Sequence, residues 1–180
     1  FDAASDETAI ISISSVSGGG ATESGTQSQT ITITDAESAP TVTLSRNNAS
    51  VSEDGGTSTL TATLSGKTYA DVTVALGAAG TATSGTDYGY TSSITISAGS
   101  TTGTSTLTST ADDLFDAASD ESATIAVAAV SGGSATESGT QTVSIAIADA
   151  ESAPTVTLLA SASTVAEDGG TSTLTATLSG

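Results

Sequence analysis

Carboxylates crowd one short stretch of this sequence. Five acidic residues fall within ten positions, and they are Asp112, Asp113, Asp116, Asp120 and Glu121. So many like charges repel one another unless a cation neutralises them. Calcium takes roughly six to eight oxygen ligands from carboxylates, carbonyls and water, so this stretch, supplemented from other loops, predicts a calcium site. The alternative interpretation is a solvated acidic loop that keeps the protein soluble.

The charge of the whole chain also favours cation binding. Twenty acidic residues stand against two basic ones, Arg46 and Lys67, and the formal net charge is -18. A chain this acidic repels polyanions, which argues against nucleic acid as a partner. No stretch approaches the roughly 18 apolar residues of a membrane-spanning helix, so we expect no direct membrane insertion. The sequence has neither cysteine nor histidine, and only hard oxygen ligands remain for a metal.

Catalysis is the function that the sequence supports least. Besides the missing histidine and cysteine, no glycine-rich phosphate loop is followed by a helix signal. Paired carboxylates could in principle hydrolyse glycosides, but here they stand among further acids, without aromatic residues to line a sugar cleft. We therefore expect that the protein is not an enzyme.

A long internal repeat organises the chain. Residues 1–66 match residues 115–180 at a constant offset of 114, and 47 of the 66 positions are identical. Each copy carries the segment Asp-Ala-Glu-Ser-Ala-Pro, at 35–40 and again at 149–154. This turn-prone segment predicts a domain boundary, and the absence of a Gly/Ser-rich spacer favours an extended rod.

The repeat predicts three parts of the chain. The expected parts are the C-terminal part of one repeat in residues 1–37, a complete repeat in 38–151, and the N-terminal part of the next repeat in 152–180.

Apolar and polar residues alternate with a period of two through the complete repeat, which predicts β-strands. The apolar positions of seven expected strands are Val42 and Leu44; Leu60, Ala62 and Leu64; Val72, Val74 and Leu76; Ile94 and Ile96; Leu107; Ile125 and Val127; and Val143, Ile145 and Ile147. The first strand is expected to continue towards Val51. Each strand has one apolar face to bury, so the sequence predicts an all-β fold, an immunoglobulin-like antiparallel β-sandwich of about seven strands.

The order of several short motifs resembles the Calx-beta domain, a family found in sodium/calcium exchangers and in many large bacterial surface proteins. The resemblance covers residues 40–151. The matching pieces are Val51-Ser52-Glu53-Asp54-Gly55-Gly56, the turn Gly85-Thr86-Asp87-Tyr88, the pairs Asp112-Asp113 and Asp120-Glu121, and the final Ile145-Ala146-Ile147-Ala148-Asp149.

In that family, calcium ions lie at one tip of the sandwich, bound by acidic residues of these motifs. The resemblance implies five main ligands, which are Glu53, Asp112, Asp113, Glu121 and Asp149. It implies four additional ligands, which are Asp87, Asp116, Asp120 and Glu151. Asp87 has the alternative role of capping its own turn. In the partial copies, Glu7, Asp35 and Glu37 correspond to Glu121, Asp149 and Glu151, and Glu167 corresponds to Glu53.

Repetition, acidity and short junctions together predict a structural function. We expect a calcium-rigidified rod or fibre segment of an extracellular, secreted surface protein, such as an adhesin stalk or filament. The alternatives are a calcium-sensing regulatory module and a ligand-binding adhesion domain. The expected partners are neighbouring repeats of the same protein, and exposed strand edges would permit self-assembly into fibres.

Overall fold

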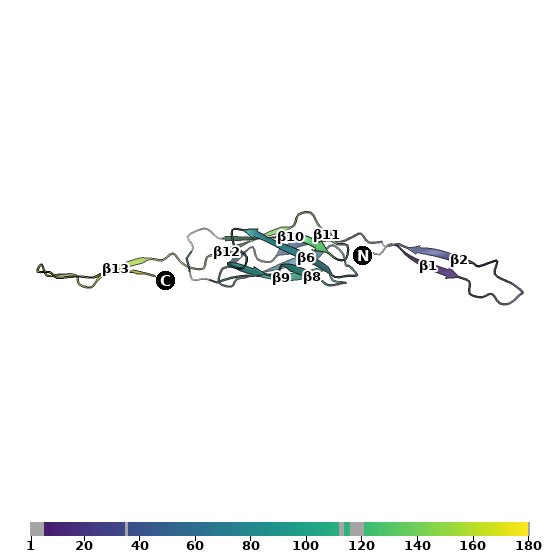
Figure 1. Cartoon of the computed structure of the whole chain (residues 1–180), viewed down its shortest axis with the longest axis horizontal. Coiled ribbons are helices and arrows are strands. Elements are labelled where there is room, and N and C mark those ends of the chain that lie inside the picture. The colour runs from purple at the N-terminus through teal and green to yellow at the C-terminus, as the bar shows by residue number, and fades with distance from the viewer. Residues whose placement is uncertain (1–5, 35, 112–113, 116–120, 180) are drawn as a thin grey trace.

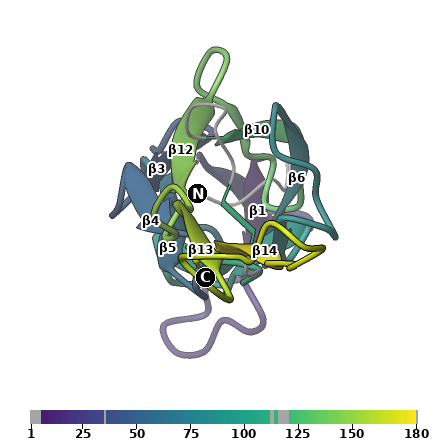
Figure 2. The same cartoon turned by 90° about the vertical axis from the view of Figure 1, so that its left-hand side faces the viewer.

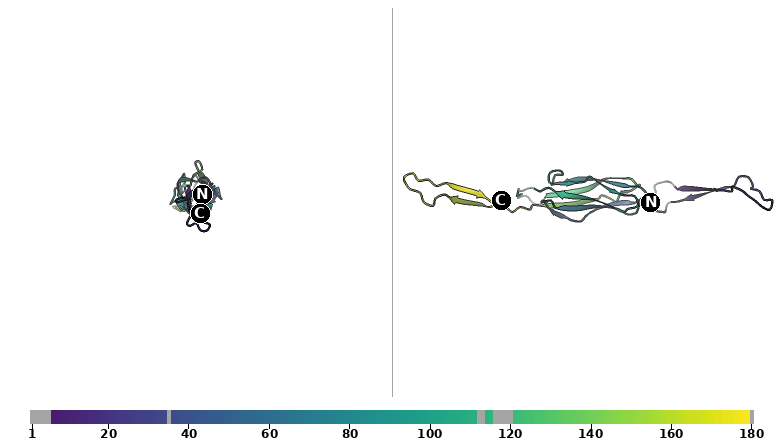
Figure 3. Two further views of the ribbon diagram at one scale, coloured as in Figure 1. Left: turned by 90° about the vertical axis from the view of Figure 1, so that its right-hand side faces the viewer. Right: turned by 90° about the horizontal axis from the view of Figure 1, so that it is seen from below.

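A β-sandwich lies between two separate β-hairpins, one at each end of the molecule (Figure 1). The computed structural model describes residues 6–34, 36–111, 114–115 and 121–179, and the regular elements within these ranges are all β-strands. When the molecule is viewed along its long axis, the hairpin strands overlap the outline of the sandwich (Figure 2). A view from below shows the elongated shape of the molecule (Figure 3).

Ten strands of the described residues build the sandwich. They are β3 (Thr41–Arg46), β4 (Ser50–Ser52), β5 (Thr57–Leu64), β6 (Val72–Gly80), β7 (Tyr88–Tyr90), β8 (Ser93–Ile96), β9 (Thr102–Ser109), β10 (Glu121–Ser131), β11 (Thr136–Glu137) and β12 (Thr142–Ala148). One sheet has the order β4-β12-β10-β6-β8 and the other the order β11-β3-β5-β9-β7. Most neighbours are antiparallel, but β4 runs parallel to β12 and β11 runs parallel to β3.

The predicted all-β sandwich is confirmed, and the seven expected strands correspond to β3, β5, β6, β8, β9, β10 and β12. The expected continuation of the first strand to Val51 is wrong, because the chain turns at Asn47. The Asn47 side chain accepts hydrogen bonds from the backbone N–H of Thr59 at 2.7 Å and from the hydroxyl of Ser58 at 3.2 Å. Asparagine favours such turns, and the chain crosses here to the other sheet, where it forms β4.

The core fills the space between the two sheets. Of the predicted apolar positions, Val127 and Val143 are partly buried and pack against the core, and the others are buried. The largest fully buried side chain is Tyr88, whose ring lies 6.1 Å from that of Tyr90. Aliphatic side chains from alternate strand positions therefore hold the two sheets together.

The end hairpins are two-stranded sheets. The N-terminal hairpin pairs β1 (Glu7–Ser12) with β2 (Ser28–Ile33), and the C-terminal hairpin pairs β13 (Val156–Ala160) with β14 (Leu174–Leu178). Both project from the sandwich along its long axis, in opposite directions (Figure 1).

Candidate metal centre

Two strands that run parallel bring three carboxylates to one end of the sandwich. Strand β4 lies beside β12 with Val51 opposite Ile147, so both strands end at the same level. Glu53 follows β4, while Asp149 and Glu151 follow β12. We call this end of the sandwich, defined by Glu53, Asp149 and Glu151, the acidic pole.

The three carboxylates of the acidic pole lie close together. One oxygen from each of Glu53, Asp149 and Glu151 lies within 4.8 Å of the other two, and all three residues are partly buried. Calcium binds oxygen at about 2.3–2.6 Å, so ligands on opposite sides of one ion are about 4.6–5.2 Å apart. The separation of these oxygens therefore fits ligation of a single calcium ion.

Backbone hydrogen bonds hold two of these side chains in place. The N–H of Ala150 donates to Oε1 of Glu53 at 3.0 Å, and the N–H of Glu151 donates to Oδ1 of Asp149 at 3.0 Å. The N–H of Glu53 donates in turn to the carbonyl of Ala148 at 3.0 Å. The carboxylates of Glu53 and Asp149 are thus fixed to the two strand ends before any ion binds, which lowers the entropy that an ion would have to remove.

The surroundings of Glu151 raise the pKa of its side chain. Its Oε2 is buried, and no N–H or hydroxyl group of the described residues donates a hydrogen bond to it. A hydrogen bond with the Glu53 side chain, burial, a hydrogen bond with Asp149 and the negative charges of Glu53 and Asp54 raise the pKa of Glu151 from 4.5 to about 7. A proton or a cation is needed here near neutral pH, because three adjacent carboxylates repel one another.

The donor set decides which metal this position fits. It consists of carboxylate oxygens, and the sequence supplies no histidine or cysteine that could add nitrogen or sulfur. Hard oxygen ligands suit calcium, whereas zinc and copper sites use imidazole or thiolate ligands. The residues present therefore fit calcium.

Glu121 reaches the same end of the sandwich from the neighbouring strand. It is the first residue of β10 and pairs with Ile147, two positions before Asp149. It is not one of the three acids that form the cluster among the described residues. Its position at the acidic pole is nevertheless consistent with a role for Glu121 as an additional ligand.

Asp87 stabilises its own turn. Its Oδ2 accepts a hydrogen bond from the backbone N–H of Thr83 at 2.6 Å, and its own N–H donates to the carbonyl of Thr83 at 2.9 Å. Its carbonyl accepts a hydrogen bond from Thr110, just after β9, at 2.8 Å. The turn-capping role is therefore present in the structure.

The acidic stretch itself falls largely outside the described residues. This applies to Asp112, Asp113, Asp116 and Asp120. The end of β9, three residues before the stretch, is anchored near Glu53, because the hydroxyl of Ser109 donates to the carbonyls of Ser52 at 2.7 Å and Gly56 at 3.1 Å. The described chain thus leaves β9 and enters β10 at the acidic pole.

One acidic residue that acts on this site was not predicted from the sequence. Asp54 was given no role as a ligand, yet its charge acts on Glu151. The available signal was its position next to Glu53 in a turn that folds back tightly, where Gly56 donates to the carbonyl of Ser52 at 3.1 Å.

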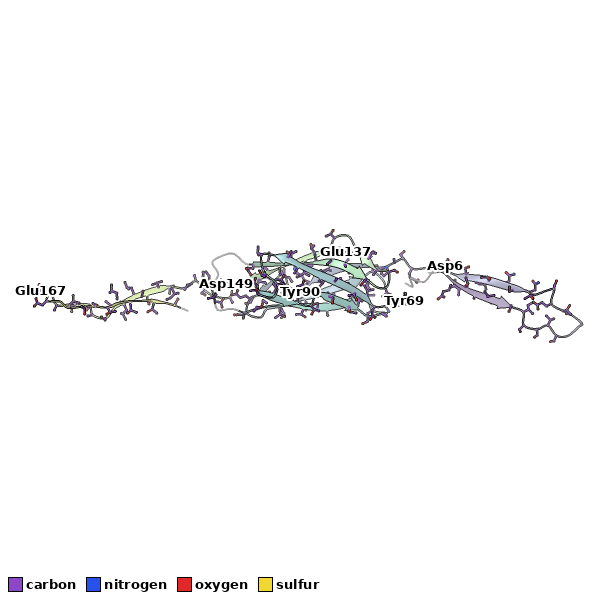
Figure 4. The ribbon with its side chains drawn as sticks, viewed as in Figure 1. Asp6, Tyr69, Tyr90, Glu137, Asp149 and Glu167 are labelled. Carbon is purple, nitrogen blue, oxygen red and sulfur yellow. The ribbon has the colours of Figure 1, made fainter. Side chains whose placement is uncertain are left out.

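The acidic pole faces the C-terminal hairpin. Figure 4 places Asp149 at the end of the sandwich from which that hairpin projects, and Tyr69 at the opposite end. Asp149 and Glu151 thus belong to the segment that joins the sandwich to the residues that follow it.

The described residues form no helix that is long and apolar enough to cross a membrane.

Two solved structures share this fold. The crystal structure of the apo form of the Calx CBD1 domain is 20% identical with a TM-score of 0.54, and the match covers 63% of this chain and 100% of that one. The crystal structure of CBD12 from CALX1.2 is 19% identical with a TM-score of 0.52, and the match covers 61% of this chain and 45% of that one. At these identities the likeness shows the fold alone.

The family of the chain follows from a sequence comparison. No curated protein matches the sequence. A family model described as the LapA domain matches residues 39–150, which is more than half of the chain and contains every strand of the sandwich. The chain therefore belongs to the LapA domain family.

Proposed function

We propose that the acidic pole binds calcium and that the bound ion stiffens this module within an extended extracellular surface protein. The observation that carries this proposal is Oε2 of Glu151, which is buried beside the carboxylates of Glu53 and Asp149 without a hydrogen-bond donor among the described residues. A divalent cation supplies the positive charge that these oxygens need.

Glu53, Asp149 and Glu151 would hold the ion. The oxygens that complete its coordination would come from the acids expected at the same pole, which are Asp87, Asp112, Asp113, Asp116, Asp120 and Glu121. Calcium needs more oxygens than three carboxylates supply when each binds through one atom, so further ligands from the chain or from water belong to the proposal.

The location of the ion explains how it would stiffen the protein. Asp149 and Glu151 lie on the segment between β12 and β13, whereas Glu53 belongs to the sandwich. One ion bound by all three therefore clamps the connecting segment against the sandwich. In a series of such modules, with boundaries near residues 37 and 151, each clamp would limit bending at a junction and keep the series extended.

The LapA domain match and the Calx-beta-like fold support a cell-surface, adhesion-related module. The proposed role is structural and not enzymatic, the proposed location is extracellular, and the proposed partners are neighbouring repeats of the same protein. The acidic surface fits this setting, because a net charge of -18 keeps separate chains apart while calcium draws the carboxylates of one pole together.

Calorimetric titration and thermal melting test the proposal. We expect calcium to bind the wild-type chain and to raise the melting temperature of the sandwich, since a ligand stabilises the state that it binds. The variant Glu151→Gln should lose most of this response. Glu137→Gln is the matched control, because Glu137 lies away from the acidic pole (Figure 4) and a glutamine there can still accept the hydrogen bond from Gln141.

Absence of calcium binding by the wild-type chain would refute the proposed function. An equal loss of binding in both variants would show that overall charge, and not the acidic pole, attracts the ion.

A further inference from the structure

Ser109 carries a buried hydroxyl group at an inward-facing position of the sandwich. It is the last residue of β9, where alternate residues face the core, and it is 4% exposed. Leu107, two residues earlier, is fully buried among the aliphatic side chains of the core. A buried hydroxyl group costs free energy unless it forms a hydrogen bond. The partner of this hydroxyl therefore shows what the serine contributes.

The hydroxyl of Ser109 binds the peptide group that precedes Glu53. It lies 2.7 Å from the carbonyl oxygen of Ser52 and 3.1 Å from that of Gly56. The backbone N–H of Ser109 already donates to the carbonyl of Gly56, at 3.0 Å. A serine hydroxyl has one hydrogen to donate, and the shorter distance makes Ser52 its main acceptor.

This peptide group is held from both sheets. Its N–H, which belongs to Glu53, donates to the carbonyl oxygen of Ala148 at the end of β12, at 3.0 Å. Its carbonyl group, which belongs to Ser52, accepts the hydroxyl of Ser109 at the end of β9. Strands β12 and β9 lie in opposite sheets of the sandwich. Because a peptide group is planar, the two bonds fix the orientation of the backbone from which the Glu53 side chain departs.

The turn that carries Glu53 does not need this hydroxyl in order to form. The N–H of Gly56 donates to the carbonyl oxygen of Ser52 at 3.1 Å and closes the turn. Gly56 lets the backbone approach this closely, because a Cβ there would collide with the same oxygen. Removal of the Ser109 hydroxyl should therefore leave the turn folded but hold the peptide group before Glu53 less firmly.

Three acid-bearing segments of the chain meet at Ser109. The turn of Glu53 is bound by the Ser109 hydroxyl. The turn of Asp87 is bound by the next residue, because the N–H of Thr110 donates to the carbonyl oxygen of Asp87 at 2.8 Å. The acidic stretch begins at Asp112, three positions after Ser109 in the sequence. Ser109 is thus placed to act on the acidic pole although it carries no charge.

We propose that Ser109 is a positioning residue of the calcium site, and that its hydroxyl raises the calcium affinity by holding Glu53 in place for ligation. This inference rests on the proposed function, in which Glu53 is a ligand. Ser109 acts through the peptide group between Ser52 and Glu53, to which its hydroxyl is directed. A carboxylate on a fixed backbone loses less conformational entropy when it binds an ion, and this difference appears as a higher affinity.

Calorimetric titration of the whole chain with calcium tests this proposal in the variant Ser109→Ala. The calcium affinity should fall by about twofold to tenfold, which is the usual worth of one hydrogen bond. Amide hydrogen exchange in a chelator gives a second measurement that needs no calcium. The N–H of Glu53 should exchange faster in Ser109→Ala than in the wild-type chain, because its peptide group has lost one of the two bonds that hold it.

Thr68→Val is the matched control. The Thr68 side chain is 3% exposed, and its hydroxyl donates to the carbonyl oxygen of Ala70 at 2.7 Å, the same distance as in the Ser109 bond. The neighbouring Tyr69 lies at the end of the sandwich opposite the acidic pole (Figure 4). Both substitutions should lower the melting temperature, since each removes a buried hydrogen bond. Thr68→Val should leave the calcium affinity and the exchange rate of the Glu53 N–H unchanged.

Three results would overturn this proposal while the proposed function stands. The first is an equal calcium affinity of the wild-type chain and Ser109→Ala. The second is an equal loss of affinity in Ser109→Ala and Thr68→Val, which would assign the effect to overall stability. The third is an unchanged exchange rate of the Glu53 N–H in Ser109→Ala, which would show that the peptide group is held without the hydroxyl. A wild-type chain that binds no calcium would instead refute the proposed function, and this inference with it.

Discussion

Glu53 and Glu151 face each other at the acidic pole, with carboxylate oxygens within 4.8 Å, although most of the sandwich separates them in sequence. This proximity results from the parallel pairing of β4 with β12, which ends both strands at one level. A hydrogen bond with the Glu53 side chain is the largest cause of the raised pKa of Glu151, followed by burial, and the negative charge of Glu53 adds to it. The candidate calcium site is therefore a consequence of the sheet topology.

The raised pKa of Glu151 predicts a pH dependence of stability without calcium. An acid whose pKa rises from 4.5 to about 7 on folding binds more protons in the folded chain than in the unfolded chain. This group therefore opposes folding increasingly as the pH rises through that interval, and it has no such effect below it. In a chelator, the melting temperature of the wild-type chain should fall between pH 5 and pH 8 more than that of Glu151→Gln.

Calcium should remove this pH dependence, because the ion replaces the proton. Binding near pH 6 should therefore release protons, whose number calorimetry obtains from titrations in buffers that differ in ionisation enthalpy. Identical pH profiles for the wild-type chain and Glu151→Gln would contradict the assigned pKa. Calcium binding without proton release would place the ion away from Glu151.

The loss of one ligand charge should weaken calcium binding markedly. In Asp149→Asn, the amide oxygen can still accept the N–H of Glu151, so the turn is expected to persist. The lower negative charge should reduce the calcium affinity by about tenfold or more, since ligand charge sets the affinity of such sites. Calorimetric titration measures the change, and Asp71→Asn, whose amide can still accept the N–H of Ala98, is a control with the same loss of charge. Equal affinities for both variants would exclude Asp149 as a ligand.

The two environments of one repeated leucine predict a contrast in stability. Leu60 is fully buried in the sandwich, whereas its counterpart Leu174 is 65% exposed. Leu60→Ala should lower the free energy of unfolding by about 2–5 kcal/mol, because it leaves a cavity between the sheets. Leu174→Ala should change it by less than about 0.5 kcal/mol. Urea denaturation followed by the fluorescence of the buried Tyr88 measures both values, and similar losses would mean that the C-terminal hairpin is packed in solution.

A glycine at the end of β6 should resist substitution. Gly80 has a φ of 121°, and a Cβ at this position would collide with the carbonyl oxygen of Ser122 on the neighbouring strand. Gly80→Ala should therefore reduce stability by more than about 1 kcal/mol. Gly66→Ala is the control, since a Cβ there has open space and φ is not positive. Thermal melting of the two variants decides the comparison, and equal melting temperatures would show that the strand ends adjust freely.

The alternation of apolar residues was sufficient to predict the sandwich. It located the seven strands of the sandwich that have four or more residues, because positions such as Leu60, Ala62 and Leu64 all face one side and are buried. It missed β4, β7 and β11, which have only two or three residues each. So short a segment contains too few positions to show a period, and its pairing depends on contacts distant in sequence.

The candidate site was predicted less completely than the fold. Glu53, Asp149 and Glu151 were named from the resemblance to a known family, and the structure brings these three together. No local pattern could predict their proximity, because it depends on the parallel pairing of two strands far apart in the chain. The roles of the acids between β9 and β10, and the boundaries of the repeats, stay predictions.

The backbone dynamics of the segment after β12 test the central claim most directly. Nitrogen-15 relaxation of the Ala150, Glu151 and Ser152 amides, measured with saturating calcium and then with a chelator, reports how firmly this segment is held. The order parameters of these amides should be about 0.85 with calcium, as in rigid backbone, and clearly lower in the chelator. Order parameters that do not change when calcium is removed would contradict it.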